Sequence, residues 1–279
     1  MPSFSKSLIA ASFGALCLAA PALAQAAKPG PMPFLPHRAV YDLSLARTTG
    51  TGGPAAVRGR IVYEFSGSAC EGYVTTFRQI TEIQMDEGGA RSSDMRSSTF
   101  EEGDGSAFRF KTDNFVDGRL VESVDGRASR AKDGALSVSL NKPATAKSDF
   151  APGPIFPTAQ MFHVLDAAKK GERATEVPVF DGGDGGMKIF DTTSIIGNEL
   201  KRAPSDASLA NAAELKNVRR WPVTVSYFDQ KKTESEPNYT LSFDLYENGV
   251  SGALKINYGN YSLNGTVSKF EVLPQKGGC

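Results

Sequence analysis

The sequence has very few of the residues that most often build metal sites and nucleophilic sites. Its 279 residues include two histidines, His37 and His163, and three cysteines. A zinc site needs three or four ligands close together, and the sequence has no cluster of histidine and cysteine. The G-x-S-x-G elbow of serine hydrolases is absent as well. We therefore expect no cofactor and no enzymatic activity.

A surplus of charge and a long apolar run are also lacking. Lysine and arginine together number 31, and aspartate and glutamate also number 31. Nucleic acids attract proteins with excess positive charge, so we expect no nucleic-acid partner. After residue 24 no segment approaches the roughly 20 apolar residues of a membrane-spanning helix. We therefore expect no stable membrane insertion.

What the N-terminus does contain is an export signal. Residues 1–24 have one charge, Lys6, then an apolar stretch and the small-residue sequence Ala22-Leu23-Ala24. This order is typical of a cleaved secretory signal peptide and predicts an exported protein. A lipoprotein would instead be modified at Cys17, but the bulky Leu16 precedes that cysteine.

Cleavage after Ala24 leaves two cysteines, Cys70 and Cys279. An even pair in an exported chain predicts a disulfide. Two buried free thiols are the alternative, although Cys279 follows Gly277 and Gly278 and has no apolar neighbour.

The rest of the chain is dominated by a period of two. After a proline-rich leader at 25–36, the residues Ala39, Tyr41, Leu43 and Leu45 alternate with polar ones, and similar segments recur to the C-terminus. Side chains alternate between the faces of a strand, so the pattern predicts an all-β domain over 37–279 with about 14 antiparallel strands. Asp-Gly pairs at 117–118, 125–126 and 133–134 predict tight turns between short strands.

One segment has helical spacing. Met161, Phe162, Leu165 and Ala168 recur with the period of an amphipathic helix near 158–170, with Thr158 as a possible N-cap and Gly171 as its end. Residues 205–217 predict another turn or two. About fourteen strands closed into a simple barrel would leave a lumen too wide for side chains to fill. The sheet must therefore be plugged, curled past closure, folded into two layers or left hollow. We expect a curled, open barrel-like sheet with the helix at a cavity suited to a lipid, glycolipid or peptide.

Candidate site residues are few. Arg219, Arg220 and the only tryptophan, Trp221, could form a cation–π or anion-facing patch, although burial of Trp221 at a strand entry is the simpler interpretation. Phe162 and His163 on the helix are further candidates for the cavity. A hydrolase using His163 with Asp166 is a remote alternative. The loop at 181–186, DGGDGG, lacks the ligand spacing of an EF-hand and predicts a flexible hairpin loop.

Four segments resemble the family of the cell envelope integrity protein EipB, and in the same order: LPHRAVYDLSL, FPTAQMFHVLDAAKKGE, VFDGGDGGMKIFDTTSIIG and WPVTVSYFD. The resemblance covers nearly the whole chain after the signal peptide. It implies a periplasmic protein that supports the Gram-negative envelope, with an overlapping β-spiral and a cup-like cavity. It also implies a disulfide between Cys70 and Cys279, and no catalytic residue. The partner would be an envelope lipid, glycolipid or peptide, or a periplasmic protein.

Overall fold

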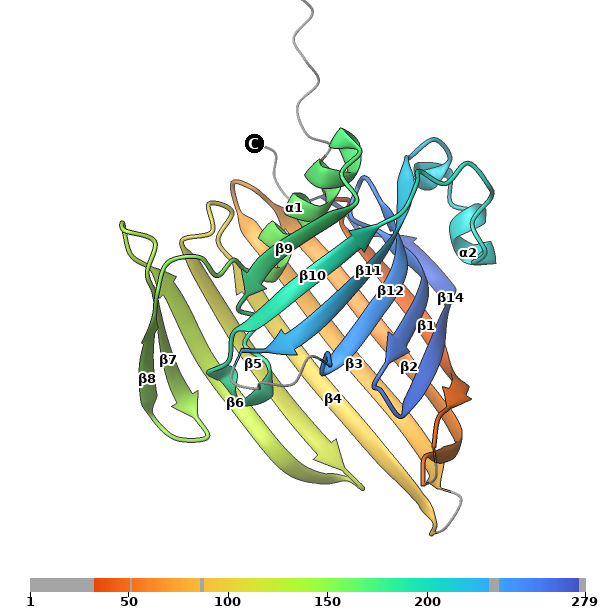
Figure 1. Ribbon diagram of the computed structural model, residues 1–279, viewed down its shortest axis with the longest axis horizontal. Helices are drawn as coiled ribbons and strands as arrows, with labels where there is room; N and C mark the ends of the chain where they lie inside the picture. The colour runs from red at the N-terminus through yellow and green to blue at the C-terminus, as the bar shows by residue number, and fades with distance from the viewer. Residues whose placement is uncertain (1–32, 51, 86–87, 231–235, 276–279) are drawn as a thin grey trace, which may run out of the picture. The chain divides into compact units, whose positions relative to one another are not determined.

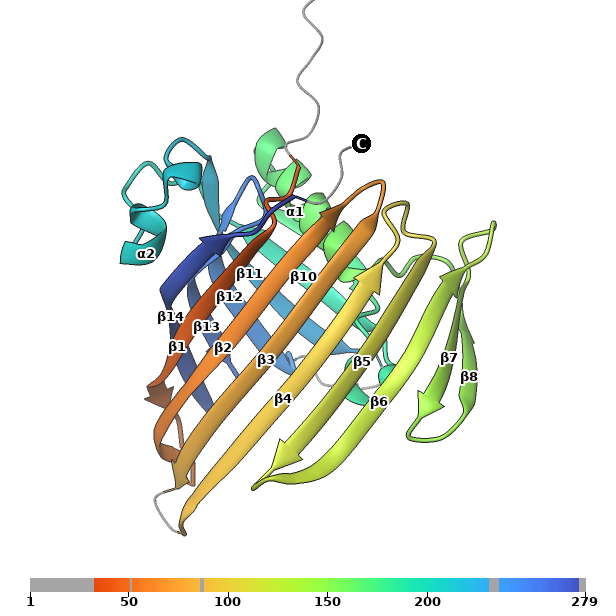
Figure 2. The ribbon, with the colours of Figure 1, turned by 180° about the vertical axis from the view of Figure 1, so that it is seen from behind.

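A computed structural model describes residues 33–50, 52–85, 88–230 and 236–275. In these residues fourteen antiparallel strands form one sheet in the order β8-β7-β6-β5-β4-β3-β2-β1-β14-β13-β12-β11-β10-β9. Neighbours in the sheet are neighbours in the sequence except where β1 pairs with β14, so the sheet stays open between β8 and β9 (Figures 1 and 2). This confirms the predicted all-β fold with an open antiparallel sheet.

The N-terminal half supplies β1 (His37–Thr48), β2 (Pro54–Ser68), β3 (Gly72–Met85), β4 (Ala90–Glu101), β5 (Ala107–Val116), β6 (Arg119–Arg130), β7 (Leu136–Lys142) and β8 (Ala146–Phe150). The C-terminal half supplies β9 (Ala174–Val179), β10 (Phe190–Ile196), β11 (Arg220–Asp229), β12 (Tyr239–Tyr246), β13 (Ser251–Asn257) and β14 (Tyr261–Val272). The helices are α1 (Pro157–Lys170) and α2 (Ala207–Ala210), with short 3₁₀ turns η1 (Asp184–Gly186) and η2 (Ala213–Leu215). None of the described helices is long and apolar enough to cross a membrane.

The helix α1 confirms the segment predicted at 158–170 and packs between two parts of the sheet. Val164 and Leu165 of α1 join a core cluster with Phe65 of β2 on one side and Val223 of β11 on the other. Figure 1 shows α1 beside β9 and β10 at one end of the sheet. We call the sheet face that contacts α1 the inner face.

The start of α1 differs from the prediction. Phe156 is the N-cap residue, Pro157 begins the helix and Thr158 lies inside its first turn. The first free N–H groups are instead satisfied by the buried carboxylate of Glu101 on β4, which accepts hydrogen bonds from the backbone nitrogens of Thr158 and Ala159 at 2.9 and 3.2 Å. The helix end is as predicted, because Gly171 adopts the left-handed conformation with φ 77°.

The glycine-rich loop 181–186 connects the β9–β10 hairpin, as predicted, but it is packed rather than loose. A Cβ at Gly182 would lie 2.4 Å from Phe110 Cγ, and one at Gly186 would lie 2.6 Å from Val124 Cγ1. Both neighbours belong to the N-terminal half of the sheet. The glycines are therefore required where this loop docks against the inner face of β5 and β6.

One predicted turn is wrong. Asp117-Gly118 and Asp133-Gly134 form turns, but Asp125 and Gly126 lie within β6 at an irregularity of its pairing with β7. A Cβ at Gly126 would come within 2.6 Å of both Leu140 and Phe110. Close packing of the inner face, rather than a chain reversal, accounts for this glycine. The expected signal peptide, most of the leader and Cys279 lie outside the described residues.

Candidate functional site

Four large side chains of the inner face remain partly exposed. Tyr63, Phe77, Leu241 and Phe243, which we call the inner-face cluster, are half-buried and pack against the two core clusters that flank them. Burial raises the pKa of Tyr63 to about 12, although its side chain keeps some contact with solvent. The inner-face cluster is therefore apolar surface that keeps partial contact with solvent.

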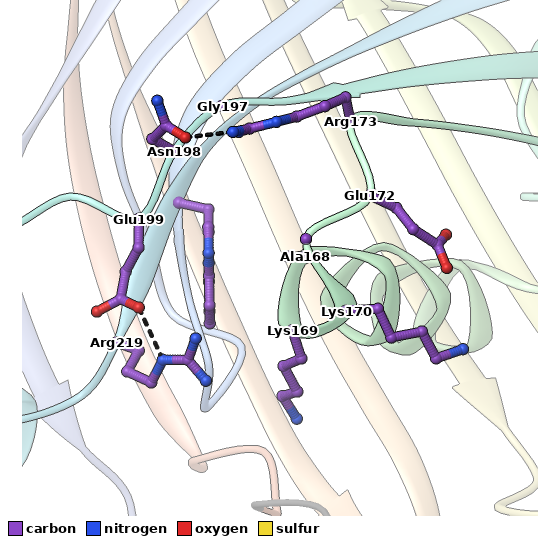
Figure 3. A pocket seen from close by; sticks show the side chains of 11 residues that line it. Ala168, Lys169, Lys170, Glu172, Arg173, Gly197, Asn198, Glu199 and Arg219 are labelled. Carbon is purple, nitrogen blue, oxygen red and sulfur yellow. Dashed lines mark hydrogen bonds and ion pairs between the residues drawn. The ribbon is translucent and has the colours of Figure 1, made fainter.

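A pocket of about 290 Å³ lies where the end of α1 meets the end of β10 and the start of β11 (Figure 3). We call it the α1–β11 pocket, and its lining consists of Ala168, Lys169, Lys170, Gly171, Glu172, Arg173, Gly197, Asn198, Glu199, Arg219 and Trp221.

Local backbone geometry brings these elements together. Gly171 reverses the chain after α1 without the steric cost that a side chain would add at φ 77°. Gly197 donates its N–H to the carbonyl of Pro222 at 2.8 Å, and a Cβ on Gly197 would lie 2.5 Å from Pro222 Cγ. The end of β10 can approach β11 this closely only with glycine at that position.

Trp221 and Arg219 form one side of the α1–β11 pocket. Trp221 is buried, with 3% of its surface exposed, and the Arg219 guanidinium lies 4.6 Å from the centre of the indole ring. Arg219 also donates to Glu199 at 3.0 Å (Figure 3). The cation–π contact and the ion pair together hold the guanidinium over the indole at the rim of the pocket.

Positive charge outnumbers negative charge around this pocket. The cations are Lys169, Lys170, Arg173 and Arg219, and the carboxylates are Glu172 and Glu199. Glu199 accepts hydrogen bonds from Lys201 and Arg219, and these bonds lower the pKa of its carboxyl group.

The remaining cations of the pocket differ in their partners. Lys169 pairs with Glu247 at 3.2 Å, whereas Arg173 contacts the neutral amide of Asn198 and has no ion pair in the described chain. The two lysines lie in the last turn of α1, where they stabilise the helix C-terminus. Arg173 therefore lines the pocket without a carboxylate partner in the described chain, and Arg219, which shares Glu199 with Lys201, is the second guanidinium of the pocket.

The other candidates from the sequence lie elsewhere. Phe162 stacks on Phe34 at 4.0 Å and contacts Tyr73, so it is part of the packing of α1. His163 is exposed on the helix. No hydrogen bond between His163 and Asp166 occurs in the described structure. In the same part of the chain no three His, Cys, Asp or Glu side chains gather where they could hold a metal ion.

Arg220 is buried on the opposite side of the strand from Trp221. It donates to the carbonyl of Arg202 at 2.6 Å and to Asp244 at 3.4 Å, and its guanidinium lies 5.7 Å from the Tyr246 ring. These contacts give Arg220 a structural role. Of the five residues proposed from the sequence, Arg219 and Trp221 line the pocket.

Several pocket residues escaped the sequence analysis. Arg173 and Asn198 lie 25 positions apart and meet because β9 pairs with β10. The positions of Arg173, Asn198 and Glu199 had no local pattern that would mark them.

Comparison with known proteins agrees with this architecture. A family model described as EipB-like matches residues 28–274. The cell envelope integrity protein EipB of Brucella abortus (strain 2308) is 37% identical over 250 residues, covering 88% of each chain. A crystal structure of a beta-barrel-like protein from Brucella abortus, described as a domain of unknown function, matches with a TM-score of 0.81 and 35% identity, covering 87% of this chain and 100% of that one. The chain belongs to the EipB-like family.

Proposed function

We propose that this chain is a non-enzymatic periplasmic protein that maintains the cell envelope by binding an amphiphilic envelope component. Its similarity to a protein named for cell envelope integrity supports the role, and the export pattern of residues 1–24 supports the location. One observation carries the ligand class. The cation-rich α1–β11 pocket and two residues of the inner-face cluster, Leu241 and Phe243, lie on the adjacent strands β11 and β12.

The register of β11 and β12 places the pocket next to these apolar side chains. Trp221 of the pocket faces Leu245 across β11 and β12, and two residues further along Val223 faces Phe243. Phe243 and Leu241 then continue the inner face away from the pocket. An amphiphile would place an acidic group against Arg173 and Arg219 and its apolar part along β12, because guanidinium groups bind carboxylate and phosphate through paired hydrogen bonds.

The test is complementation of a strain that lacks the gene, challenged with detergent and with cell-wall antibiotics. Wild type should restore survival, and the double variant R173Q/R219Q should restore much less. The matched control is K201Q, since Lys201 also contacts Glu199 but does not line the pocket. Unchanged survival of the deletion strain argues against the envelope role. Full rescue by R173Q/R219Q argues against the pocket as the binding site.

The inner-face cluster also favours a second candidate, a carrier of lipids or lipoproteins. Partly exposed aromatic and aliphatic side chains are typical lining for acyl chains. A carrier should retain an amphiphile after gentle purification, which native mass spectrometry would detect. Protein that is repeatedly empty and takes up no fluorescent lipid would exclude this function.

The remote hydrolase hypothesis would use His163 with Asp166, and both residues are exposed on α1. Because His163 is exposed on α1, replacing it with alanine should not disturb packing. We expect H163A to rescue the deletion strain fully. Loss of rescue with normal folding would revive the enzyme hypothesis.

A further inference from the structure

Several arginines on the outer face of the sheet, opposite α1, have a carboxylate partner within the sheet. Arg60 donates to Asp42 at 2.8 Å, and Arg78 donates to Asp94 at 2.8 Å. Arg96 binds the same Asp94 at 2.7 Å. Each of these three arginines therefore has a carboxylate partner within the sheet.

A groove of about 510 Å³ across β3–β7 contains cations that lack such partners among the described residues. We call it the β3–β7 groove, and Arg109, Lys111 and Arg127 contribute exposed positive charge to it. None of these three cations has an ion pair in the described part of the chain. The one carboxylate in the lining, Asp125, accepts a hydrogen bond from Asn141 at 2.8 Å.

The placement of two of these cations is unfavourable for the sheet itself. Arg109 and Arg127 are direct cross-strand partners on β5 and β6. Like charges facing each other across a strand pair destabilise a sheet. A bound anion between the two guanidinium groups would convert this repulsion into attraction.

Apolar surface adjoins the cations. The Arg109 guanidinium lies 4.4 Å from the centre of the Phe100 ring, which is its cross-strand partner on β4. Val74 faces Phe100 from β3 and is 37% exposed. The groove thus offers two forked donors beside an apolar contact, in one row across four strands.

We propose that the β3–β7 groove is a second binding site, which takes the phosphate group of an anionic ligand between Arg109 and Arg127, with Lys111 beside it. Phosphate has several acceptor oxygens that point in different directions. Two arginines and a lysine can therefore donate hydrogen bonds to it from different sides. Val74 and Phe100 would contact the part of the ligand next to the phosphate. This site is separate from the α1–β11 pocket and does not depend on the function proposed for it.

The experiment measures binding of the processed full-length protein to two phosphate sources. One arm uses vesicles of phosphatidylglycerol against vesicles of phosphatidylcholine, and the other titrates inorganic phosphate by calorimetry. The test variant is R109Q/R127Q. Its matched control is R60Q/R78Q, which removes the same charge from the same face but from arginines that already have partners.

We expect R109Q/R127Q to weaken binding about tenfold or more, the size of losing charge-assisted hydrogen bonds, while R60Q/R78Q changes it little. Binding in the vesicle arm alone identifies a lipid headgroup as the source, and binding in the phosphate arm alone identifies a soluble phosphate compound; both support the site. The proposal is overturned if neither probe binds, if both double variants lose binding equally, or if only an acidic peptide binds. The substituted side chains are exposed, so both double variants should fold. Thermal unfolding checks this, and R109Q/R127Q should unfold at an unchanged or higher temperature because two facing like charges are removed.

Discussion

Glu101 of β4 accepts a hydrogen bond from the backbone nitrogen of Thr158 in α1 at 2.9 Å, although the two residues are 57 positions apart. Its second oxygen accepts from Ala159 at 3.2 Å. The first turn of a helix has N–H groups without intrahelical partners, and a carboxylate there is favoured by the helix dipole. This buried contact fixes the start of α1 to the N-terminal half of the sheet.

Replacing Glu101 with glutamine should destabilise the protein by about 1–2 kcal/mol, because one amide oxygen remains but the NH₂ group cannot accept a hydrogen bond. Urea unfolding followed by circular dichroism measures the loss. The matched control is Glu102→Gln, a neighbouring residue outside the core. Equal stability of the two variants would show that the cap contributes nothing.

Glu101 should also make stability depend on pH. Burial raises the pKa of Glu101 above 4.5, against the opposing effect of its hydrogen bonds with Thr158. Between pH 4.5 and the raised pKa the folded state binds more protons than the unfolded state, so this group adds stability as the pH falls through that window. The difference in unfolding free energy between wild type and E101Q should therefore widen from neutral to mildly acidic pH. A difference that narrows over the same range would contradict the raised pKa.

The glycine loop offers a matched pair of substitutions. Gly185 and Gly186 both have positive φ, 79° and 75°, but a Cβ at Gly185 meets nothing within 4 Å. Gly185→Ala should cost about 1–2 kcal/mol, the price of a left-handed alanine. Gly186→Ala should cost about 1–3 kcal/mol more, because its Cβ overlaps Val124. Thermal and urea unfolding of the two variants would measure the difference, and equal losses would mean that the loop is not packed against β6.

The disulfide between Cys70 and Cys279 stays a prediction, and the strand register is compatible with it. Val272, at the end of β14, pairs with His37, and His37 pairs with Phe65 near the β2–β3 turn that holds Cys70. Two strand spacings are about 10 Å, and the five residues from Phe65 to Cys70 add at most about 17 Å along the strand, so Val272 and Cys70 are at most about 20 Å apart. The seven residues after Val272 can extend about 23 Å.

We expect Cys279→Ser to lower the melting temperature by several degrees under oxidising conditions without preventing folding, since about 5 kcal/mol is the upper entropic estimate for a loop this long. Mass spectrometry of the intact, unreduced protein should show the crosslink in wild type. Reducing agent should lower the melting temperature of wild type but not that of the variant. A melting temperature unaffected by the substitution would show that the crosslink is absent or contributes no stability.

The predictions from sequence succeeded where the signal was local. Alternation identified β1, where Ala39, Tyr41 and Leu43 are buried, and helical spacing identified α1. They failed where a distant partner decided the outcome. Thr158 has the side-chain chemistry of an N-cap residue, but the carboxylate that accepts from the first turn of α1 belongs to Glu101 on β4. Gly126 follows an aspartate, as Gly118 and Gly134 do in their turns. It nevertheless lies within β6, where Phe110 and Leu140 pack against it.

The sequence by itself determined the all-β fold and the helix α1, because both depend on spacing along a short stretch; it also predicts the export signal and the disulfide. Only the tertiary structure decided the two candidate sites. Arg173 and Arg219 share a pocket because three separate elements converge there, and Arg109 stands opposite Arg127 because of the register of β5 and β6. Register and convergence are set by packing over the whole sheet, which no local pattern encodes.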